Sequence, residues 1–173
     1  METKIPKYLM MSSVAIQKMD LKDIGNILEI LSGAKKIYIM GNGGSAATAL
    51  HFALDLNKAA GLNAVCLNGN PALISAFAND DGYESIFASQ LERAERFDVL
   101  VAISCSGNSQ NVLRAVRYAK DFSKMPVIGF TGDEGGKLAE EAEFLVKVPN
   151  PDIKIQEDAH LALCHAITQS LEK

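Results

Sequence analysis

His51 and Asp55 carry side chains that can move protons, and they stand four residues apart in an alanine-rich stretch. The composition of residues 45–58 favours a helix, and positions four apart share one face of a helix. The imidazole and the carboxylate are therefore expected to lie side by side. Such a pair can act as an acid and a base toward a substrate, or it can be a plain hydrogen bond on a surface or at an interface.

The helix that carries this pair begins at a glycine-rich turn, GNGGS, at residues 41–45. A turn of this kind between a strand and a helix also fits the GxGxxA pattern of dinucleotide-binding domains. Those domains hold the ribose with an acidic residue at the end of the next strand, and here that strand ends at Asn68. The sequence therefore argues against a nicotinamide or flavin dinucleotide and predicts no organic cofactor.

A second turn of small residues, ISCSGNS, supplies three hydroxyl groups, at Ser104, Ser106 and Ser109. The turn also leads into a predicted helix, whose unpaired amides and dipole attract anions. These features predict a binding site for a phosphate monoester. The alternative is that the serines only cap helices, as Ser109 could do.

Both turns belong to a repeating pattern of strands and helices. Short runs rich in β-branched residues predict five strands, at 36–40, 63–68, 98–104, 126–131 and 143–149. Helices are predicted at 45–58, 71–78, 84–94 and 155–171, and another from residue 108 or 109 to about 122, with a short one after residue 136. The alternation predicts the α/β class, as a three-layer sandwich whose five-stranded parallel sheet is doubly wound, with right-handed crossovers and helices on both faces.

The ends of several elements can be placed from single residues. Asn70 followed by Pro71 is typical of a helix N-terminus. Helical spacing of apolar residues before residue 33 predicts an N-terminal helical segment, and the pattern leaves open whether Asp20 caps a second helix there. The chain has no linker, repeat or low-complexity tract, so residues 1–173 are expected to form a single domain.

Composition excludes several other classes of protein. The 173 residues carry a formal net charge of −4 without a long basic block, which argues against a nucleic-acid ligand. The three cysteines, Cys66, Cys105 and Cys164, form no CxxC pair, which fits a reducing cytoplasm. We see neither a signal peptide nor an apolar stretch of about 20 residues that could span a membrane, so we expect a soluble cytoplasmic protein.

The ordered set of motifs GNGGSA, SxSGNSxNV and TGxxGGKLA, each after a strand, resembles the sugar isomerase (SIS) domain family over almost the whole chain. Within that family the chain looks most like the phosphoheptose isomerases. The resemblance implies a homotetramer with active sites between subunits. It also implies that the phosphate is bound by residues of the two turns: Asn42, Gly43, Gly44, Ser45, Ser104, Cys105, Ser106 and Ser109.

The implied reaction converts sedoheptulose 7-phosphate to D-glycero-D-manno-heptose 7-phosphate through an enediol, for heptose and lipopolysaccharide biosynthesis. Moving a carbonyl between C1 and C2 needs a base for the carbon-bound proton and an acid for the carbonyl oxygen. The resemblance implies that the carboxylate four residues after His51 is one of the two. The family has Glu at that place, whereas this chain has Asp55, and the shorter side chain leaves room for a different sugar phosphate.

The second acid–base residue is expected on the last helix, where the family has a Gln, a His three later and another His five beyond that. Matching the histidines to His160 and His165 puts Glu157 at the Gln position, whereas matching Gln156 requires a one-residue gap. A gap rotates the rest of a helix by about 100°, so we adopt the histidine match and assign the catalytic role to His165. The two histidines lie roughly 140° apart around the helix, so one of them is expected to be structural.

Some phosphoheptose isomerases bind zinc with residues at these positions. The matching set here is His51, Asp55, Glu157 and His165, and the ligand types suit zinc.

Two further positions follow from the place where strands end. Asn79 and Asp80 end a predicted helix at the edge where such folds bind ligands; the resemblance implies contacts with sugar hydroxyls, and the alternative is a plain Asx turn. Thr131 follows a strand at the same edge.

A protein of this family need not be an enzyme, because some SIS domains bind a phosphosugar or a protein partner as regulatory modules. The feature that separates the two classes is the acid–base pair. A carboxylate at Asp55 together with His165 favours an aldose–ketose isomerase over a non-catalytic module.

Overall fold

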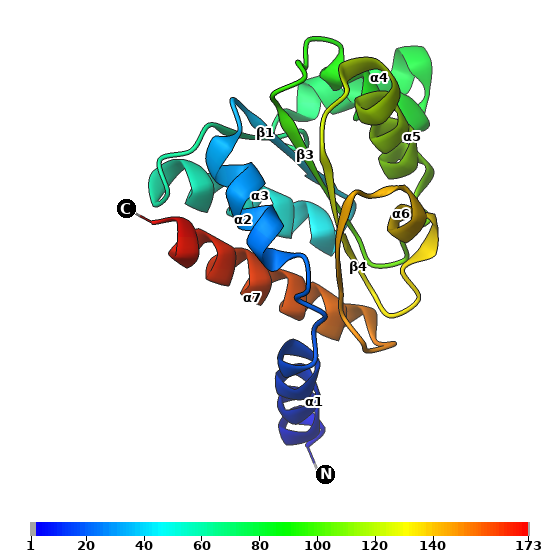
Figure 1. The fold of residues 1–173 in the computed structure, drawn as a ribbon. Helices are drawn as coiled ribbons and strands as arrows, with labels where there is room; N and C mark the ends of the chain where they lie inside the picture. The colour runs from blue at the N-terminus through cyan, green and yellow to red at the C-terminus, as the bar shows by residue number, and fades with distance from the viewer. Residues whose placement is uncertain (1–2, 173) are drawn as a thin grey trace.

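The computed structural model describes residues 3–172. It contains a five-stranded parallel sheet in the order β2-β1-β3-β4-β5, with helices on both faces (Figure 1). This confirms the predicted sandwich. The strands are β1 (Ile37–Gly41), β2 (Ala64–Cys66), β3 (Val99–Ser104), β4 (Val127–Thr131) and β5 (Phe144–Lys147).

The two faces of the sheet are covered by different helices. One core packs α2 (Ile24–Gly33), α3 (Gly44–Lys58) and α7 (Ile153–Leu171) on the sheet. The other core packs α5 (Gln110–Tyr118) and α6 (Gly136–Glu141) on the opposite face, beside α4 (Pro71–Asp81). Alternate residues of β1 supply both cores, because side chains along a strand point to opposite faces: Ile37 and Ile39 to the first, Tyr38 and Met40 to the second.

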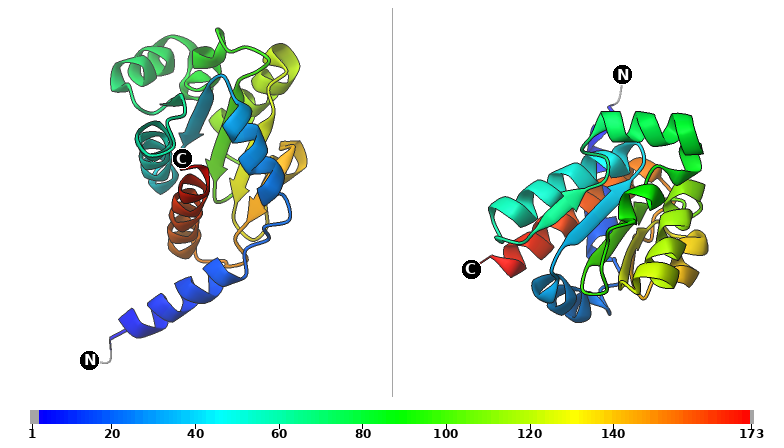
Figure 2. Two further views of the ribbon diagram at one scale, coloured as in Figure 1. Left: turned by 60° about the vertical axis from the view of Figure 1, so that its left-hand side comes forward. Right: turned by 90° about the horizontal axis from the view of Figure 1, so that it is seen from above.

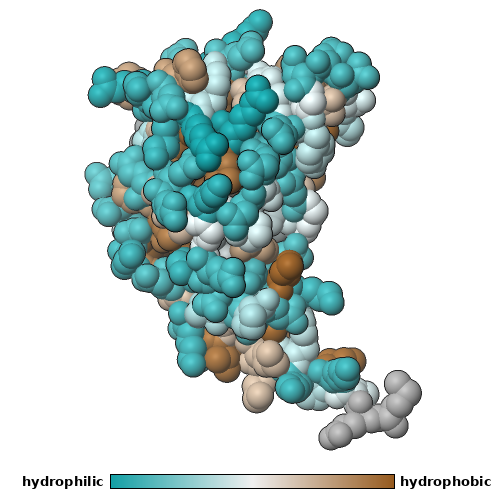
Figure 3. All heavy atoms as spheres, turned by 90° about the vertical axis from the view of Figure 1, so that its right-hand side faces the viewer, coloured by the Kyte–Doolittle hydropathy of each residue, from teal (hydrophilic) through white to brown (hydrophobic). Residues whose placement is uncertain are grey.

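The N-terminal segment divides into two helices, α1 (Ile5–Gln17) and α2. Asp20 lies between them and caps neither; its backbone amide donates to the carbonyl oxygen of Lys147 at 3.4 Å. Helix α1 projects from the body and touches it near the start of α7 (Figures 1 and 2), where the Tyr8 hydroxyl donates to Asp158 at 2.6 Å. Hydrophobic side chains lie among the surface atoms of this projecting end (Figure 3).

Element boundaries differ from the prediction mainly where the backbone changes helix type. Residues 84–94 were predicted as one helix but form two 3₁₀ turns, η1 (Tyr83–Ser85) and η2 (Ala88–Leu91). The helix α5 ends early and continues as a π-helical turn, η3 (Ala119–Ser123). Helix α4 extends past its predicted end at residue 78, because no chain-breaking conformation occurs before Gly82, whose φ is +85°.

The predicted start of α4 is confirmed in atomic detail. The Asn70 side chain accepts hydrogen bonds from the backbone amides of Ala72 and Leu73, and Pro71 occupies the first turn. Within residues 3–172 no helix combines the length and apolar character needed to cross a lipid bilayer.

Candidate active site

The first glycine turn is shaped by the absence of side chains. A Cβ atom on Gly41 would lie 2.7 Å from the Ser45 backbone, and Gly43 has a φ of +54°, which L side chains rarely adopt. The side chain of Asn68 fixes the turn from the neighbouring strand: its Oδ1 accepts from the Gly41 amide at 3.3 Å, and its Nδ2 donates to the Gly41 carbonyl at 2.9 Å. Asn68, the residue that argued against a ribose site, therefore stabilises the glycine turn.

The two turns are tied together by a pair of asparagines. Asn42 Nδ2 donates to Asn111 Oδ1 at 2.8 Å, and Asn111 Nδ2 donates back to Asn42 Oδ1 at 2.9 Å. The Tyr83 hydroxyl donates to the same Asn42 oxygen at 3.3 Å. Asn111 was not among the predicted site residues, although it is the second asparagine of the SxSGNSxNV motif. A buried amide at the start of a helix is the signal that could have drawn attention to it.

The second turn completes a small pocket, here called the serine hollow, with a volume of about 180 Å³. Ser109 is the first residue before α5, but its side chain does not cap that helix, so the capping alternative is wrong for Ser109 in this structure. Ser45 Oγ lies 3.9 Å from Cys105 Sγ across the hollow. The lining residues are Asn42, Ser45, Ile103, Ser104, Cys105, Ser106, Ser109, Ile153 and Glu157.

Four serine hydroxyls contribute to the surface of this hollow. It lies beside the N-termini of α3 and α5, where unpaired amides and the helix dipole favour an anion. Burial raises the pKa of the Cys105 thiol above its ordinary value, so that side chain stays uncharged at neutral pH. The arrangement can bind an anionic group such as a phosphate.

The predicted acid–base residues lie together in a second place, here called the imidazole cluster: His51, Asp55 and His165. The Nε2 atom of His51 is 3.3 Å from Asp55 Oδ2, and the Nε2 atom of His165 is 3.7 Å from the same oxygen. The two rings meet edge to face with centroids 5.0 Å apart. Within a single chain, the Asp55 carboxylate on α3 therefore lies between the imidazole of His51, on the same helix, and the imidazole of His165, on α7.

The two histidines of α7 have different environments. His160 is fully buried, and its Nε2 lies 3.1 Å from the Thr131 carbonyl oxygen. Because that oxygen can only accept, Nε2 carries the proton; burial lowers the pKa of this imidazole to about 4 and keeps it neutral. The side chain of His165 is 52% exposed. His160 is therefore the structural one of the pair, and His165 is free to meet a substrate.

Glu157 does not join the imidazole cluster, in contrast to the predicted set of four metal ligands. It lies two turns earlier on α7 and lines the serine hollow, where its carboxylate covers the Cα of Gly44. Gln156 is buried, and its Nε2 donates to the Asn150 carbonyl at 2.6 Å. Of these two neighbouring residues, Glu157 lines the serine hollow and Gln156 does not.

The three side chains of the imidazole cluster fit a zinc ion by geometry. Their ligand atoms all lie within 4.8 Å of one another. Ligands about 2.0–2.1 Å from a tetrahedral zinc lie roughly 3.3 Å from each other, which is close to the two distances to Asp55. Two imidazoles and one carboxylate form a ligand set found in catalytic zinc sites, in which the fourth position stays open.

Asn79 and Asp80 lie apart from both groups within this chain. They form the last turn of α4, where Asn79 Nδ2 donates to Asp80 Oδ1 at 2.8 Å, and both side chains are exposed. The segment just after them reaches the site through Tyr83. Thr131 is fully buried beneath α7, where it pairs with Ser104 of the neighbouring strand and is not itself among the residues that line the serine hollow.

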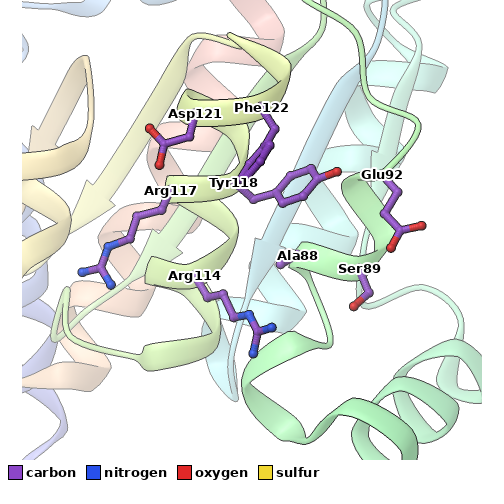
Figure 4. A pocket seen from close by; sticks show the side chains of 8 residues that line it. All are labelled: Ala88, Ser89, Glu92, Arg114, Arg117, Tyr118, Asp121 and Phe122. Atoms are coloured by element: carbon purple, nitrogen blue, oxygen red, sulfur yellow. The ribbon is translucent and has the colours of Figure 1, made fainter.

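A larger hollow, of about 360 Å³, lies between α5 and η2, where Tyr118 points toward the segment of Ser89 and Glu92 (Figure 4). It is remote from every predicted site residue. Its charges largely offset one another: Arg117 is paired with Glu141 at 2.7 Å, and Arg114 lines the hollow together with the carboxylates of Glu92 and Asp121. Its volume does not mark it as the site, because the hollow beside Asp55 and His165 has a volume of about 410 Å³.

Comparison with known proteins agrees with the fold. The family model described as "SIS domain" matches residues 10–132, more than half of the chain. The architecture is that of a SIS domain.

Comparison with individual relatives shows which members of the SIS domain family the chain resembles. The phosphoheptose isomerase of Helicobacter pylori (strain P12) is 36% identical over 165 residues, which cover 92% of this chain and 85% of the relative. That of Mycobacterium tuberculosis (strain CDC 1551 / Oshkosh) is 41% identical over 143 residues, covering 79% and 72%. The structure of the phosphoheptose isomerase from Neisseria gonorrhoeae superimposes with a TM-score of 0.90 at 32% identity, covering 98% of each chain.

The chain therefore belongs to the SIS domain family and, within it, to the phosphoheptose isomerases. It is an isomerase, so the alternative of a non-catalytic regulatory module is not supported.

Proposed function

We propose that this chain interconverts sedoheptulose 7-phosphate and D-glycero-D-manno-heptose 7-phosphate, in the cytoplasm, for heptose and lipopolysaccharide biosynthesis. The observation that carries the proposal is the position of Asp55 between His51 and His165, in a chain whose relatives are phosphoheptose isomerases. The reaction needs one base and one acid close together, and the imidazole cluster supplies both.

The phosphate end of the substrate is assigned to the serine hollow. The hydroxyls of Ser45, Ser104, Ser106 and Ser109 and the amides at the starts of α3 and α5 provide hydrogen-bond donors there. Polar groups fixed by the backbone hold a phosphate without rearranging, which favours tight and oriented binding. The sugar hydroxyls then extend toward Asn79 and Asp80 of the assembled enzyme.

At the reacting end, the Asp55 carboxylate takes a proton from C1 of the ketose while His165 donates a proton to the carbonyl oxygen on C2. The product of this step is an enediol. The proton on Asp55 then returns to C2, and the O1 hydroxyl gives its proton back to His165, so the aldose forms with no net gain or loss of protons. His51, 3.3 Å from Asp55, orients the carboxylate. For this proton transfer the Asp55 carboxylate must lie within hydrogen-bonding distance of the group it deprotonates. Because the Asp side chain is short, C1 of the substrate must approach α3 closely.

Zinc is proposed at the same cluster because the three residues fit it. His51, Asp55 and His165 would hold the ion. When bound there, the ion would polarise the substrate carbonyl as a Lewis acid, in place of the proton that His165 otherwise donates.

We also propose that the chain works as a homo-oligomer, with a tetramer as the expected form and active sites shared between subunits. Exposed apolar side chains on two helices support this: Leu50 and Leu54 on α3, and Leu9 and Met10 on α1. Ser45 and Asp55 are ten residues apart on one helix, which is about 15 Å. From C2 to phosphorus, an extended heptulose phosphate spans roughly 8 Å, at roughly 1.2 Å per bond, which is less than this separation. The serine hollow of one subunit would therefore be matched with the imidazole cluster of a neighbouring subunit.

The test is to incubate the purified protein with sedoheptulose 7-phosphate and to follow aldose formation by NMR. We expect turnover by the unaltered protein and a loss of kcat of about 10²- to 10⁴-fold in Asp55→Asn and in His165→Ala. Asp81→Asn, at the end of α4, serves as a matched control that should keep its activity. Absence of turnover on this and other ketose phosphates, with a folded protein of normal mass in solution, would contradict the proposal.

A further inference from the structure

The motif TGxxGGKLA lies outside both the serine hollow and the imidazole cluster. It contains the loop between β4 and α6, here called the glycine loop, at residues 132–136. The loop is joined to the Ser-rich segment that lines the hollow, here called the serine turn, at residues 104–109. The Gly132 amide donates to the Cys105 carbonyl at 2.9 Å. The glycine loop therefore helps to hold the serine turn in place.

The serine turn and the glycine loop approach each other so closely that glycines are needed where they meet. A Cβ atom on Gly107 would collide with the carbonyl oxygen of Gly135, and one on Gly136 would collide with the carbonyl oxygen of Ser106. Glycine is the residue that permits such a close approach of two backbones. The Leu138 amide, in α6, also donates to the Gly107 carbonyl at 2.9 Å. Backbone contacts thus bring the serine turn against the start of α6.

The side chain of Asn108 adds a further connection between these segments. Its Oδ1 accepts a hydrogen bond from the Lys137 amide at 3.2 Å, and its Nδ2 donates to the Ser106 carbonyl at 2.9 Å. The backbone amide of Asn108 donates to Ser106 Oγ at 3.2 Å. Ser106 lines the serine hollow, whereas Asn108 does not. Two of these three hydrogen bonds therefore end on a residue of the hollow.

These contacts determine what the Ser106 hydroxyl can offer to a ligand. A hydroxyl has one proton to donate and two lone pairs that accept. Because Ser106 Oγ accepts from the Asn108 amide, its own proton remains available, and a phosphate oxygen is an acceptor that can take it. The Asn108 side chain holds the Ser106 peptide in the conformation that allows this contact. Donors that are oriented in advance bind an anion at a smaller cost in conformational entropy.

We propose that Asn108 is a positioning residue for phosphate binding: it ties the serine turn to α6 and thereby orients the Ser106 hydroxyl toward the ligand. The identity of the ligand as a sugar phosphate rests on the proposed function. A local role, as a turn residue before α5, needs only contacts within the turn. The hydrogen bond to Lys137, 29 residues further along the chain, goes beyond that role.

The experiment measures dissociation constants for inorganic phosphate by calorimetry in the full-length protein, in Asn108→Ala, in Ser106→Ala and in the double variant. We expect each single substitution to weaken phosphate binding about fivefold, which corresponds to one ordinary hydrogen bond. Because Asn108 acts through Ser106, the double variant should bind phosphate no more than about twofold more weakly than Ser106→Ala.

Gln110→Ala is the matched control. This exposed side chain belongs to the same segment and donates to the Asn108 carbonyl at 3.1 Å. The variant should bind phosphate as the unaltered protein does, because the hydrogen bonds of the Asn108 side chain stay in place.

Kinetics with sedoheptulose 7-phosphate give a second readout. Asn108→Ala should raise KM about fivefold and change kcat by less than about twofold, because it removes binding that the ground state and the transition state share. Gln110→Ala should change neither quantity.

An unchanged phosphate affinity in Asn108→Ala or in Ser106→Ala would overturn the proposal. For Asn108→Ala this holds even with a lower free energy of unfolding in urea, since Asn108 would then support the fold alone. Additive losses in the double variant, or a fall in kcat at constant KM, would also overturn it. The phosphate measurement needs no turnover. A protein that isomerises no heptose phosphate but shows the non-additive loss would therefore contradict the proposed reaction and leave the role of Asn108 in place.

Discussion

The serine hollow and the imidazole cluster are built on the same two helices, α3 and α7, yet they are held in different ways. The hollow depends on backbone conformation: glycines at Gly41 and Gly43, and amide side chains that bridge strands and turns. The imidazole cluster depends on three side chains that point from helix surfaces and remain partly exposed. The first is rigid before a ligand arrives, whereas the second can adjust to a substrate or a metal ion.

This difference suggests a division of labour between the two regions. An anion is bound with little reorganisation by preset amides and hydroxyls. Proton transfer needs groups whose charge changes during the reaction, and solvent-exposed imidazoles keep that freedom. Substitutions that disturb backbone conformation should therefore affect binding and stability together, while those in the imidazole cluster should affect catalysis alone.

The largest effect is expected from Gly41→Ala. The added Cβ would lie 2.7 Å from the backbone of Ser45, so the turn must shift, and we expect a loss of about 3 kcal/mol in the free energy of unfolding with phosphate affinity at least tenfold weaker. Urea denaturation and calorimetry measure the two quantities. Gly25→Ala in α2 is the control, since nothing lies within 4 Å of its Cβ position, and it should be neutral or slightly stabilised. A Gly41→Ala variant with unchanged stability and unchanged phosphate affinity would show that the serine hollow does not depend on the backbone conformation of this turn.

A second prediction concerns pH and separates His160 from His165. The folded-state pKa of His160 is lowered to about 4, below the ordinary 6.5, so between these values the unfolded chain takes up a proton that the folded chain excludes. Stability is therefore complete above about pH 6.5 and falls as the pH drops toward 4, by up to about 3 kcal/mol.

Unfolding free energies measured from pH 7 to pH 4 test this prediction. His160→Gln should have a shallower pH dependence than the unaltered protein, whereas His165→Gln should keep the original slope. Equal slopes for all three proteins would show that burial of His160 does not control its protonation.

The smallest effect is expected for Asn111→Ala, which removes the two hydrogen bonds to Asn42. We expect a loss of about 1–2 kcal/mol in stability and a several-fold rise in KM, with kcat nearly unchanged, because Asn111 supports the binding turn and not the imidazole cluster. Asn63→Ala is the matched control, since Asn63 makes one exposed hydrogen bond to the Lys35 carbonyl. A fall in kcat without a change in KM would place Asn111 with the reacting groups instead.

Patterns local to a few residues were predicted from sequence and are present in the structure. The five strands, the parallel sheet and the start of α4 at Asn70 and Pro71 are examples, because apolar periodicity and capping residues act over short distances. Residues 84–94 show the limit of such patterns. They contain good helix-forming residues, but packing against α5 holds them as two short turns.

The sequence by itself determined the two glycine-containing turns, the pairing of His51 with Asp55, and the Asp and Glu that distinguish this chain at positions 55 and 157. Those features depend on residue identity and on spacing within one element. Only the tertiary structure decided which histidine of α7 is buried, that Asn111 joins the two turns, and that Glu157 belongs to the serine hollow and not to the imidazole cluster. The reason is that the packing of α7 along α3 fixes which of its residues face the sheet, the hollow or the solvent, and that packing depends on the whole sheet.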